Sequence, residues 1–283
     1  MSKNKNHHYV SYCYQKNFFK EEDRKYYELI KSKNQLTGKI LGEGEKRGQL
    51  NTQFSLDELN TMTVEDKQSG SNIIYVKSEN HTKEETKFAK KETNVGIELR
   101  HLIKNLDDAG DEYVDYLIRE KETVYKTFVD IIDLLFSMNY QRKVEAENII
   151  KQGISGIVGQ INNIKLSKNN NNRDVINIVR FNLNKVPEQF ERIHNWLVLK
   201  SDCDSICYGD EPCSFCYVRG NSHVLFPLNY RYFVIGYDEY YNDIDCVLLL
   251  NYYYQKQKII CRRDYDWFSR CITNFSSVKL INC

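Results

Sequence analysis

The sequence lacks the features that would place it in several large classes of protein. Its 283 residues carry a net charge of only +1, so no overall electrostatic field draws the protein to nucleic acid or to a membrane surface. No apolar run reaches the roughly 18 residues of a membrane span, and no apolar signal stretch follows Met1–Asn6. We therefore expect a cytoplasmic protein with no membrane partner, whose nine cysteines are reduced thiols and not a disulfide framework.

The standard motifs of catalysis and nucleotide binding are also missing. The sequence contains neither a G-x-x-x-x-G-K-S/T loop nor a G-x-G-x-x-G loop, so it has neither common phosphate cradle. It has no H-E-x-x-H zinc motif and no G-x-S-x-G nucleophile elbow. These absences exclude the standard forms of such sites and leave divergent forms open.

The N-terminal part of the chain is predicted to consist of strands and loops. The stretch His7–Phe19 is rich in Tyr, Val and Phe, which favours a strand. Lys20–Arg24 is predicted to be the turn that leads into the return strand of a hairpin, Tyr26–Ile30. Leu36–Asn94 is polar and broken by glycines, so we expect short strands and loops there, with one clear strand at Asn72–Val76.

The middle of the chain is predicted to form an antiparallel helical hairpin. For the first helix, Asp107 or Asp108 is a suitable N-cap. Its apolar residues recur at helical spacing, namely Leu117, Val124, Phe128, Ile131 and Leu135. The second helix is marked by isoleucines at steps of four and three, namely Ile150, Ile154, Ile157, Ile161 and Ile164. Such apolar stripes pack against a neighbouring helix, so both are expected to build core.

A mixed lobe of strands and helices follows a polar asparagine tract, Lys168–Arg173. The predicted strands are Val175–Phe181, Trp196–Leu199, Val224–Phe226, Tyr232–Ile235 and Lys258–Arg262. The predicted helices are Glu188–His194, Asp243–Gln257 and Tyr265–Phe275. Strands at both ends with helices between them indicate an α+β fold. We expect a single domain, 1–283, made of an N-terminal strand region (1–95), a helical region (96–166) and a C-terminal α/β lobe (173–283).

The densest group of reactive residues is a C-x3-C-x5-C-x2-C cluster. It consists of Cys203, Cys207, Cys213 and Cys216. Four thiolates so close in sequence can complete a tetrahedral structural zinc site, but they leave no open position for a catalytic zinc. The central gap of five residues is short for a two-knuckle zinc ribbon, so thiols in a surface loop are the alternative.

Paired histidines, His7 and His8, stand at the start of the first predicted strand. Neighbouring residues of a strand point to opposite faces, so at most one of the two can face a given pocket. A neutral histidine can act as a base or as a metal ligand. On the residues alone, two exposed histidines near a terminus are the simpler interpretation.

The N-terminal segment resembles the opening of the bacterial domain-of-unknown-function 4238 family. Residues 8–18 are HYVSYCYQKNF, and the family typically begins His-Tyr-Val-Pro, followed by an aromatic residue, a Leu-basic pair and a Phe. Ser11 stands in place of the proline and Gln15 in place of the leucine. The residues that keep the pattern are His8, Tyr9, Val10, Tyr14 and Phe18.

Further short segments are similar to the same family and occur in the same order. Residues 96–99 contain a glutamate, Glu98, like the one that opens the family's central helices. Residues 136–142 resemble a helix that ends in Gln-x-x-Arg, with Arg142 retained. Residues 199–202 keep the Ser-Asp of Ile-Thr-Ser-Asp-Asn-Pro, with Asp202 as the acid, and residues 226–229 resemble Pro-Leu-Ser-Pro. Asn251 falls where the family tends to carry an asparagine.

The resemblance implies one domain and an enzyme-like site gathered from distant segments. Its expected members are His8, Glu98, Arg142, Asp202 and Asn251. A histidine and two carboxylates can hold a divalent metal or share acid and base duties, while an arginine can clamp a phosphate. This combination predicts a hydrolase of phosphodiesters or nucleotides, with a nucleic acid or nucleotide as partner. The family has no assigned reaction, so a role as a defence or toxin effector rests on analogy alone.

A non-catalytic binding or regulatory module is the alternative prediction. In this hypothesis His8, Arg142 and Asp202 belong to a buried hydrogen-bonded network that ties the N-terminal strand to the helices and to the C-terminal lobe. Buried polar groups have to be paired, so such a network is structurally demanding without doing chemistry. A pocket that reaches these side chains favours the enzyme, whereas mutual pairing favours the network.

Overall fold

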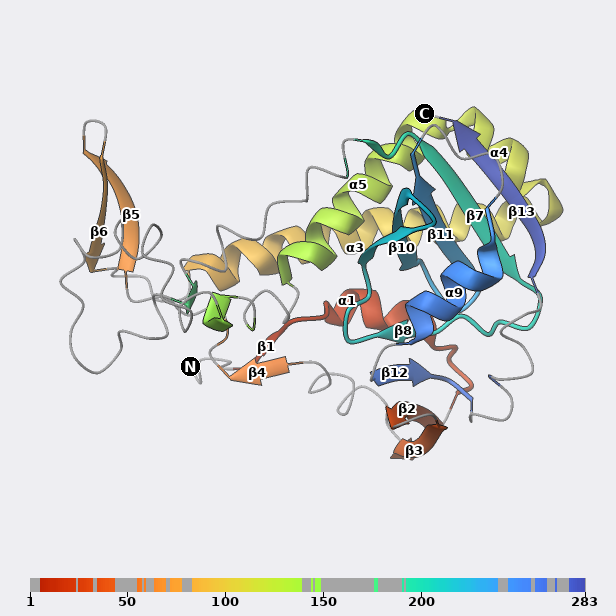
Figure 1. Cartoon of the computed structure of the whole chain (residues 1–283), viewed down its shortest axis with the longest axis horizontal. Coiled ribbons are helices and arrows are strands. Elements are labelled where there is room, and N and C mark those ends of the chain that lie inside the picture. Colours follow the sequence, from red (N-terminus) through yellow and green to blue (C-terminus); the bar gives the residue numbers. More distant parts are fainter. Residues whose placement is uncertain are drawn as a thin grey trace.

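The chain folds as an α+β protein, as the sequence predicts, with antiparallel sheets, the largest of which packs against a pair of long helices (Figure 1). The computed structural model describes residues 6–23, 25–32, 35–43, 55–57, 59, 64–69, 72–77, 83–138, 144, 146–148, 176–177, 190, 192–238, 244–255, 258–263, 268 and 275–282. Within this part of the chain, no helix combines the length and the apolar character needed to cross a membrane.

In the described part of the chain, strands with a short helix come first, then the long helices, then strands around helix α9. The strands are β1 (Asn6–His8), β2 (Lys25–Ser32), β3 (Gln35–Glu43), β4 (Ser55–Asp57), β5 (Val64–Ser69), β6 (Asn72–Lys77), β7 (Asn195–Ser201), β8 (Tyr208–Gly209), β9 (Ser214–Val218), β10 (Asn221–Pro227), β11 (Tyr232–Tyr237), β12 (Lys258–Cys261) and β13 (Phe275–Asn282). The helices are α1 (Tyr12–Gln15), α3 (Lys83–Ala109), α4 (Tyr113–Arg119), α5 (Lys121–Met138) and α9 (Cys246–Tyr254), with short 3-10 turns η1 (Lys16–Phe18) and η2 (Gly110–Glu112).

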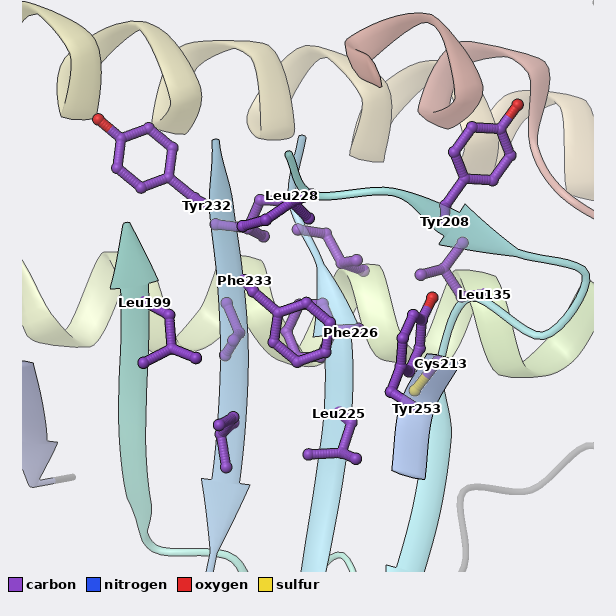
Figure 2. Packing of buried hydrophobic residues seen from close by; sticks show 14 of the residues in the cluster. Leu135, Leu199, Tyr208, Cys213, Leu225, Phe226, Leu228, Tyr232, Phe233 and Tyr253 are labelled. Atoms are coloured by element: carbon purple, nitrogen blue, oxygen red, sulfur yellow. The ribbon is translucent and has the colours of Figure 1, made fainter. Parts of the chain in front are cut away.

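The largest sheet is antiparallel, with the strand order β13-β7-β11-β10-β9. On one face, Phe128 of α5 packs against Trp196 of β7 and Phe226 of β10, with ring centroids 5.4 and 5.7 Å apart. On the other face, Phe233 of β11 packs against Tyr253 of α9 at 5.0 Å (Figure 2). All six residues of β11 are buried, because both faces of the sheet are covered. This explains the continuous apolar runs that predict these strands.

A second sheet joins distant parts of the chain, in the order β3-β2-β12-β8. Its central strand β12 pairs with β2 on one side and with β8 on the other. Asp23 lies just before β2, and Arg262 lies just after β12. The antiparallel pairing of these two strands therefore brings Asp23 and Arg262 to the same end of the sheet.

The two long helices, α3 and α5, run antiparallel to each other. Two ion pairs between them, Lys91 with Asp133 and Lys126 with Glu98, connect residues whose order is reversed between the helices. The buried side chains of α3 recur at steps of three and four, namely Val95, Leu99, Leu102 and Leu106. The predicted apolar stripe is buried in α4 and α5, namely Leu117, Val124, Phe128, Ile131 and Leu135.

The helical hairpin pairs different helices from those predicted, because the predicted first helix corresponds to α4 and α5, and α5 packs against α3. Helix α3 begins at Lys83, inside a stretch predicted to be strands and loops, and Asp107 and Asp108 lie within its last turn and do not cap a helix. Asp107 is instead held by a tertiary contact, since its carboxylate accepts hydrogen bonds from Arg231 and Tyr232. The isoleucine stripe Ile150–Ile164 lies outside the described residues.

The predicted strand His7–Phe19 is wrong over most of its length. Only its start belongs to a strand, β1, which pairs with β4 and not with β2. The chain then turns into α1, because the Ser11 hydroxyl caps that helix by accepting a hydrogen bond from the Tyr14 amide. The predicted strands Tyr26–Ile30 and Asn72–Val76 are confirmed as parts of β2 and β6.

In the C-terminal lobe most predicted elements are confirmed and a few are not. The predictions that hold correspond to β7, β10, β11, α9 and β12. Ile176 and Asn177 are helical where a strand is predicted, and Phe275 begins β13 where a helix is predicted to end. Strand β9, within the cysteine-rich segment, was not predicted.

Candidate functional site

The described residues of the predicted polar site lie on separate elements. His8 belongs to β1, where its ring stacks on Tyr12 at 5.9 Å. Glu98 lies in α3, while Asp202 and Asn251 are exposed, in the turn after β7 and in α9. Arg142 lies outside the described residues.

These side chains are not brought together into one shell. Glu98 contacts Lys126, and within the described part of the chain Glu98, Asp202 and Asn251 share no hydrogen bond or ion pair with one another. Strand β1 lies well apart from β7 and α9 (Figure 1). The polar residues that do converge are different ones.

Six charged side chains from five separate segments meet around the ring of Tyr230. We call this group the charged junction, and its members are Lys20, Asp23, Asp107, Asp204, Arg231 and Arg262. Three are cations and three are anions, so the group is neutral as a whole. The cations of Lys20, Arg231 and Arg262 lie 5.2, 5.8 and 4.8 Å from the centre of the Tyr230 ring.

The innermost pair of the charged junction joins Asp23 to Arg262. The guanidinium donates two hydrogen bonds, from Nε to Oδ2 at 2.9 Å and from Nη2 to Oδ1 at 3.0 Å. Both side chains are almost fully buried, with 5% and 6% exposed. A two-pronged pair of this kind fixes orientation as well as distance. It locks the turn before β2 to the end of β12.

Asp204 stands at the centre of the charged junction. Its Oδ2 accepts a hydrogen bond from Lys20 at 2.6 Å, its Oδ1 accepts one from Arg231 Nε at 3.1 Å, and Arg262 lies 3.6 Å away. Burial acts to raise the pKa of Asp204, but the hydrogen bonds and charges of Lys20 and Arg231 outweigh it and lower the pKa below its ordinary 3.8. Asp204 is therefore held as the carboxylate.

Arg231 connects the charged junction to helix α3 through Asp107. Arg231 donates from Nη1 to Asp107 at 2.7 Å, and the Tyr232 hydroxyl donates to the same carboxylate at 3.2 Å. Burial first, and the Asp107 charge second, raise the pKa of Tyr232, so the hydroxyl remains a donor. Every charge of the charged junction thus has an opposite partner within it.

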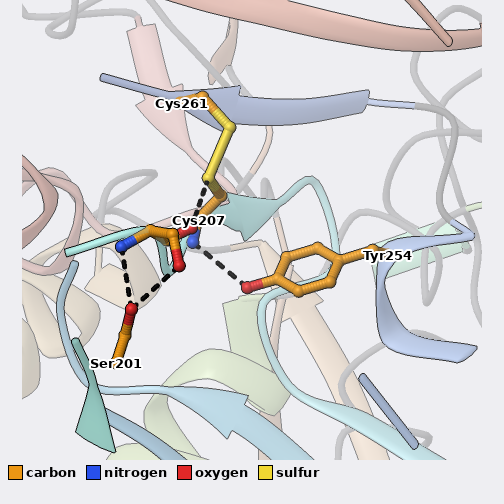
Figure 3. The surroundings of a disulfide bond; sticks show 5 residues. Ser201, Cys207, Tyr254 and Cys261 are labelled. Atoms are coloured by element: carbon orange, nitrogen blue, oxygen red, sulfur yellow. Dashed lines mark hydrogen bonds between the residues drawn. A yellow bond between two sulfur atoms is a disulfide. The ribbon is translucent and has the colours of Figure 1, made fainter. Parts of the chain in front are cut away.

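A disulfide lies beside the charged junction and joins Cys207 to Cys261 (Figure 3). Cys261 is followed directly by Arg262, and the Cys207 amide donates to the Tyr254 hydroxyl at 3.2 Å. Both cysteines are buried, and they continue the pairing of β8 with β12. The expectation of reduced thiols is therefore wrong for this pair.

The four clustered cysteines do not assemble a zinc site. Cys207 is turned toward β12 by its disulfide, Cys213 and Cys216 are buried at β9, and Cys203 is partly exposed. Among the described residues, no group of three or more His, Cys, Asp or Glu side chains is placed to hold a metal ion. For the same reason, the described residues hold no such group for the divalent metal expected near His8, Glu98 and Asp202.

A groove of about 180 Å³ lies between α3, α4 and α5. Leu102 and Val124 form its apolar part. The polar residues that line it are Glu98, His101, Asn105, Tyr116, Thr123, Lys126 and Thr127. Glu98 is thus a predicted site residue that reaches a cavity, and we call this cavity the helical groove.

Two features distinguish Glu98 from the acids of the charged junction. Its Oε1 is 3.5 Å from Lys126, whose ammonium makes a shorter contact of 2.7 Å with Asp130. Its Oε2 is buried and has no hydrogen-bond partner. Buried polar atoms are nearly always paired, and the Glu98 side chain as a whole is 40% exposed, so a partner can reach this acceptor from outside.

The charged junction was not found by sequence analysis, because no motif marks its members. Asp202, the acid expected from the resemblance, lies two residues from Asp204 and is exposed. Comparison of the chain with protein-family models, with curated proteins and with solved structures found no match.

Proposed function

We propose that the protein is a non-catalytic binding module whose charged junction is structural and whose ligand-binding site is the helical groove. One observation carries this proposal: every cation of the charged junction contacts a carboxylate of the same group, at 2.6–3.6 Å. Catalytic acids and bases need a free position toward substrate, whereas the charged groups of the junction contact one another.

The distribution of polar residues supports the binding module over the hydrolase. Hydrolysis of a phosphodiester requires acid, base and anion-binding groups within about 3 Å of one reacting centre. Asp202 and Asn251 are exposed on different elements, and neither lines the helical groove. A module that binds without reacting needs only a rigid frame and a cavity, and the charged junction and the helical groove supply these.

A pair of neighbouring substitutions tests the proposal. Asp204→Asn removes a central charge while keeping the shape of the side chain, and Asn tolerates the positive φ of 53° at this position. It leaves Arg231 and Lys20 without their carboxylate, so we expect a loss of about 1–3 kcal/mol in the free energy of unfolding. Asp202→Asn, in the same loop but exposed, should change that free energy by no more than about 0.5 kcal/mol.

Urea denaturation of both variants measures the difference. If Asp204→Asn were as stable as the parent protein, the charged junction would not be structural, and its side chains would be available for chemistry.

A further inference from the structure

We propose that the helical groove binds a small molecule with a protonated amino group, and that Glu98 Oε2 accepts the hydrogen bond from it. This inference rests on the proposed binding module and gives the chemical class of its ligand. It starts from the one buried carboxylate oxygen that the described structure leaves unpaired, which lies on a side chain lining a cavity.

The charges around the helical groove favour a cation. Glu98 and Asp130 carry two negative charges, and Lys126 supplies one positive charge between them. The Lys126 ammonium lies 0.8 Å closer to Asp130 than to Glu98, since the contacts measure 2.7 and 3.5 Å. Lys126 is thus committed mainly to Asp130. One negative charge is left over on Glu98, and an ammonium ligand would neutralise it.

The other polar groups of the groove suit an N–H donor as well. Asn105 Nδ2 donates to the Tyr116 hydroxyl at 3.0 Å, which fixes the amide so that its carbonyl oxygen is left as an acceptor. Thr127 already donates its hydroxyl to the Thr123 carbonyl at 3.0 Å, so it does not compete as a donor for Glu98. Asn105 Oδ1 is therefore a second acceptor for an N–H donor on this wall of the groove.

The size of the groove restricts the ligand. Its volume of about 180 Å³ is below the roughly 300–1,000 Å³ of cavities that hold drug-sized molecules. A short alkyl chain can lie on Leu102 and Val124 while its amino group reaches Glu98. A phosphate or carboxylate ligand would instead place a negative charge against the unpaired oxygen of Glu98, which is unfavourable.

Titration of the full chain with propylammonium chloride, followed by protein NMR, tests the assignment. Sodium propionate and 1-propanol, at matched ionic strength, serve as anionic and neutral probes of similar size. We expect saturable binding of propylammonium alone, and binding at least about tenfold weaker to Glu98→Gln, because the amide lacks the charge that strengthens the hydrogen bond. Glu112→Gln, an exposed acid of η2 outside the groove, should bind like the parent protein.

The remaining outcomes would contradict either the amine assignment or the non-catalytic proposal. Failure of the parent protein to bind propylammonium, or equal binding by Glu98→Gln, would overturn the amine assignment and leave water as the partner of Oε2. Preferential binding of propionate would overturn it too. If NMR of the recovered probe showed chemical conversion of the amine, the ligand class would stand and the non-catalytic proposal would fail.

Discussion

The charged junction and the helical groove contain the same types of charged residue, but they differ in how these residues are paired. In the charged junction three acids and three bases are all paired, and Asp23 and Arg262 are almost fully buried. In the helical groove one acid, Glu98, keeps a buried oxygen without a partner, and its nearest cation is committed elsewhere. Loss of one partner from a buried charge pair destabilises a fold, whereas an unpaired buried acceptor is a cost that a ligand can offset. This difference in pairing distinguishes the structural role of the charged junction from the proposed binding role of the helical groove.

The largest effect is expected at the innermost pair of the charged junction. Arg262→Met should lower the free energy of unfolding by about 3–5 kcal/mol, because it leaves the buried Asp23 carboxylate without its partner. Arg119→Met is the matched control, since its pair with Glu120 is exposed, with 70% and 42% of the two side chains accessible. Urea denaturation should place the control within about 1 kcal/mol of the parent protein. Similar losses of unfolding free energy in both variants would mean that buried and exposed ion pairs contribute equally to stability.

The disulfide beside the charged junction should have the next largest effect. Cys261→Ser is expected to cost about 2–4 kcal/mol, because the bond between Cys207 and Cys261 closes a long loop and restricts the unfolded chain. Peptide mapping after alkylation without reduction checks the bond itself. Labelling of Cys207 and Cys261 before any reductant is added would mean that the bond does not form.

Acid should weaken the charged junction in a defined range of pH. The lowered pKa of Asp204 means that its contribution is fully present above the ordinary value of 3.8 and is lost as the pH falls through the folded-state pKa. The parent protein should therefore lose its advantage in melting temperature over Asp204→Asn only below about pH 4. A constant difference between pH 7 and pH 2 would show that the carboxylate charge is not what stabilises this loop.

The smallest effect is expected at an ion pair between the two long helices. Lys91 pairs with Asp133, and both side chains remain partly exposed, at 31% and 44%. Lys91→Met should change the free energy of unfolding by at most about 1 kcal/mol, since solvent screens such pairs. Thermal unfolding followed by circular dichroism measures it. A loss as large as that of Arg262→Met would mean that pairing and not burial determines the effect.

The sequence predicts well those elements whose type follows from the apolar pattern of their own residues. Strands β10 and β11 are continuous apolar runs because both faces of their sheet are covered, and the stripe from Val124 to Leu135 has clean helical spacing. The start of α3 was missed because Lys83–Asn94 is a polar surface segment without an apolar stripe. Its Lys, Glu and Ala content does favour a helix, so propensity would have been the better guide.

The charged junction could not be predicted, because its pairs are set by tertiary structure. Asp23 and Arg262 are far apart in the chain and meet only because β2 pairs with β12. The resemblance proposes Glu98 as a member of a catalytic site and says nothing of the helical groove, whose walls depend on the antiparallel packing of α3 on α5. A sequence motif can identify a residue without identifying its partners.

The most direct test applies one chemical change to both regions. Asp204→Asn and Glu98→Gln each convert a carboxylate into an amide of the same shape, and urea denaturation at pH 7 compares the two with the parent protein. We expect opposite outcomes. Asp204→Asn is destabilised by about 1–3 kcal/mol, and Glu98→Gln is as stable as the parent protein or more stable, because a neutral amide costs less to bury than a charged oxygen without a partner. Equal destabilisation of both variants would contradict the division into a structural junction and a binding groove.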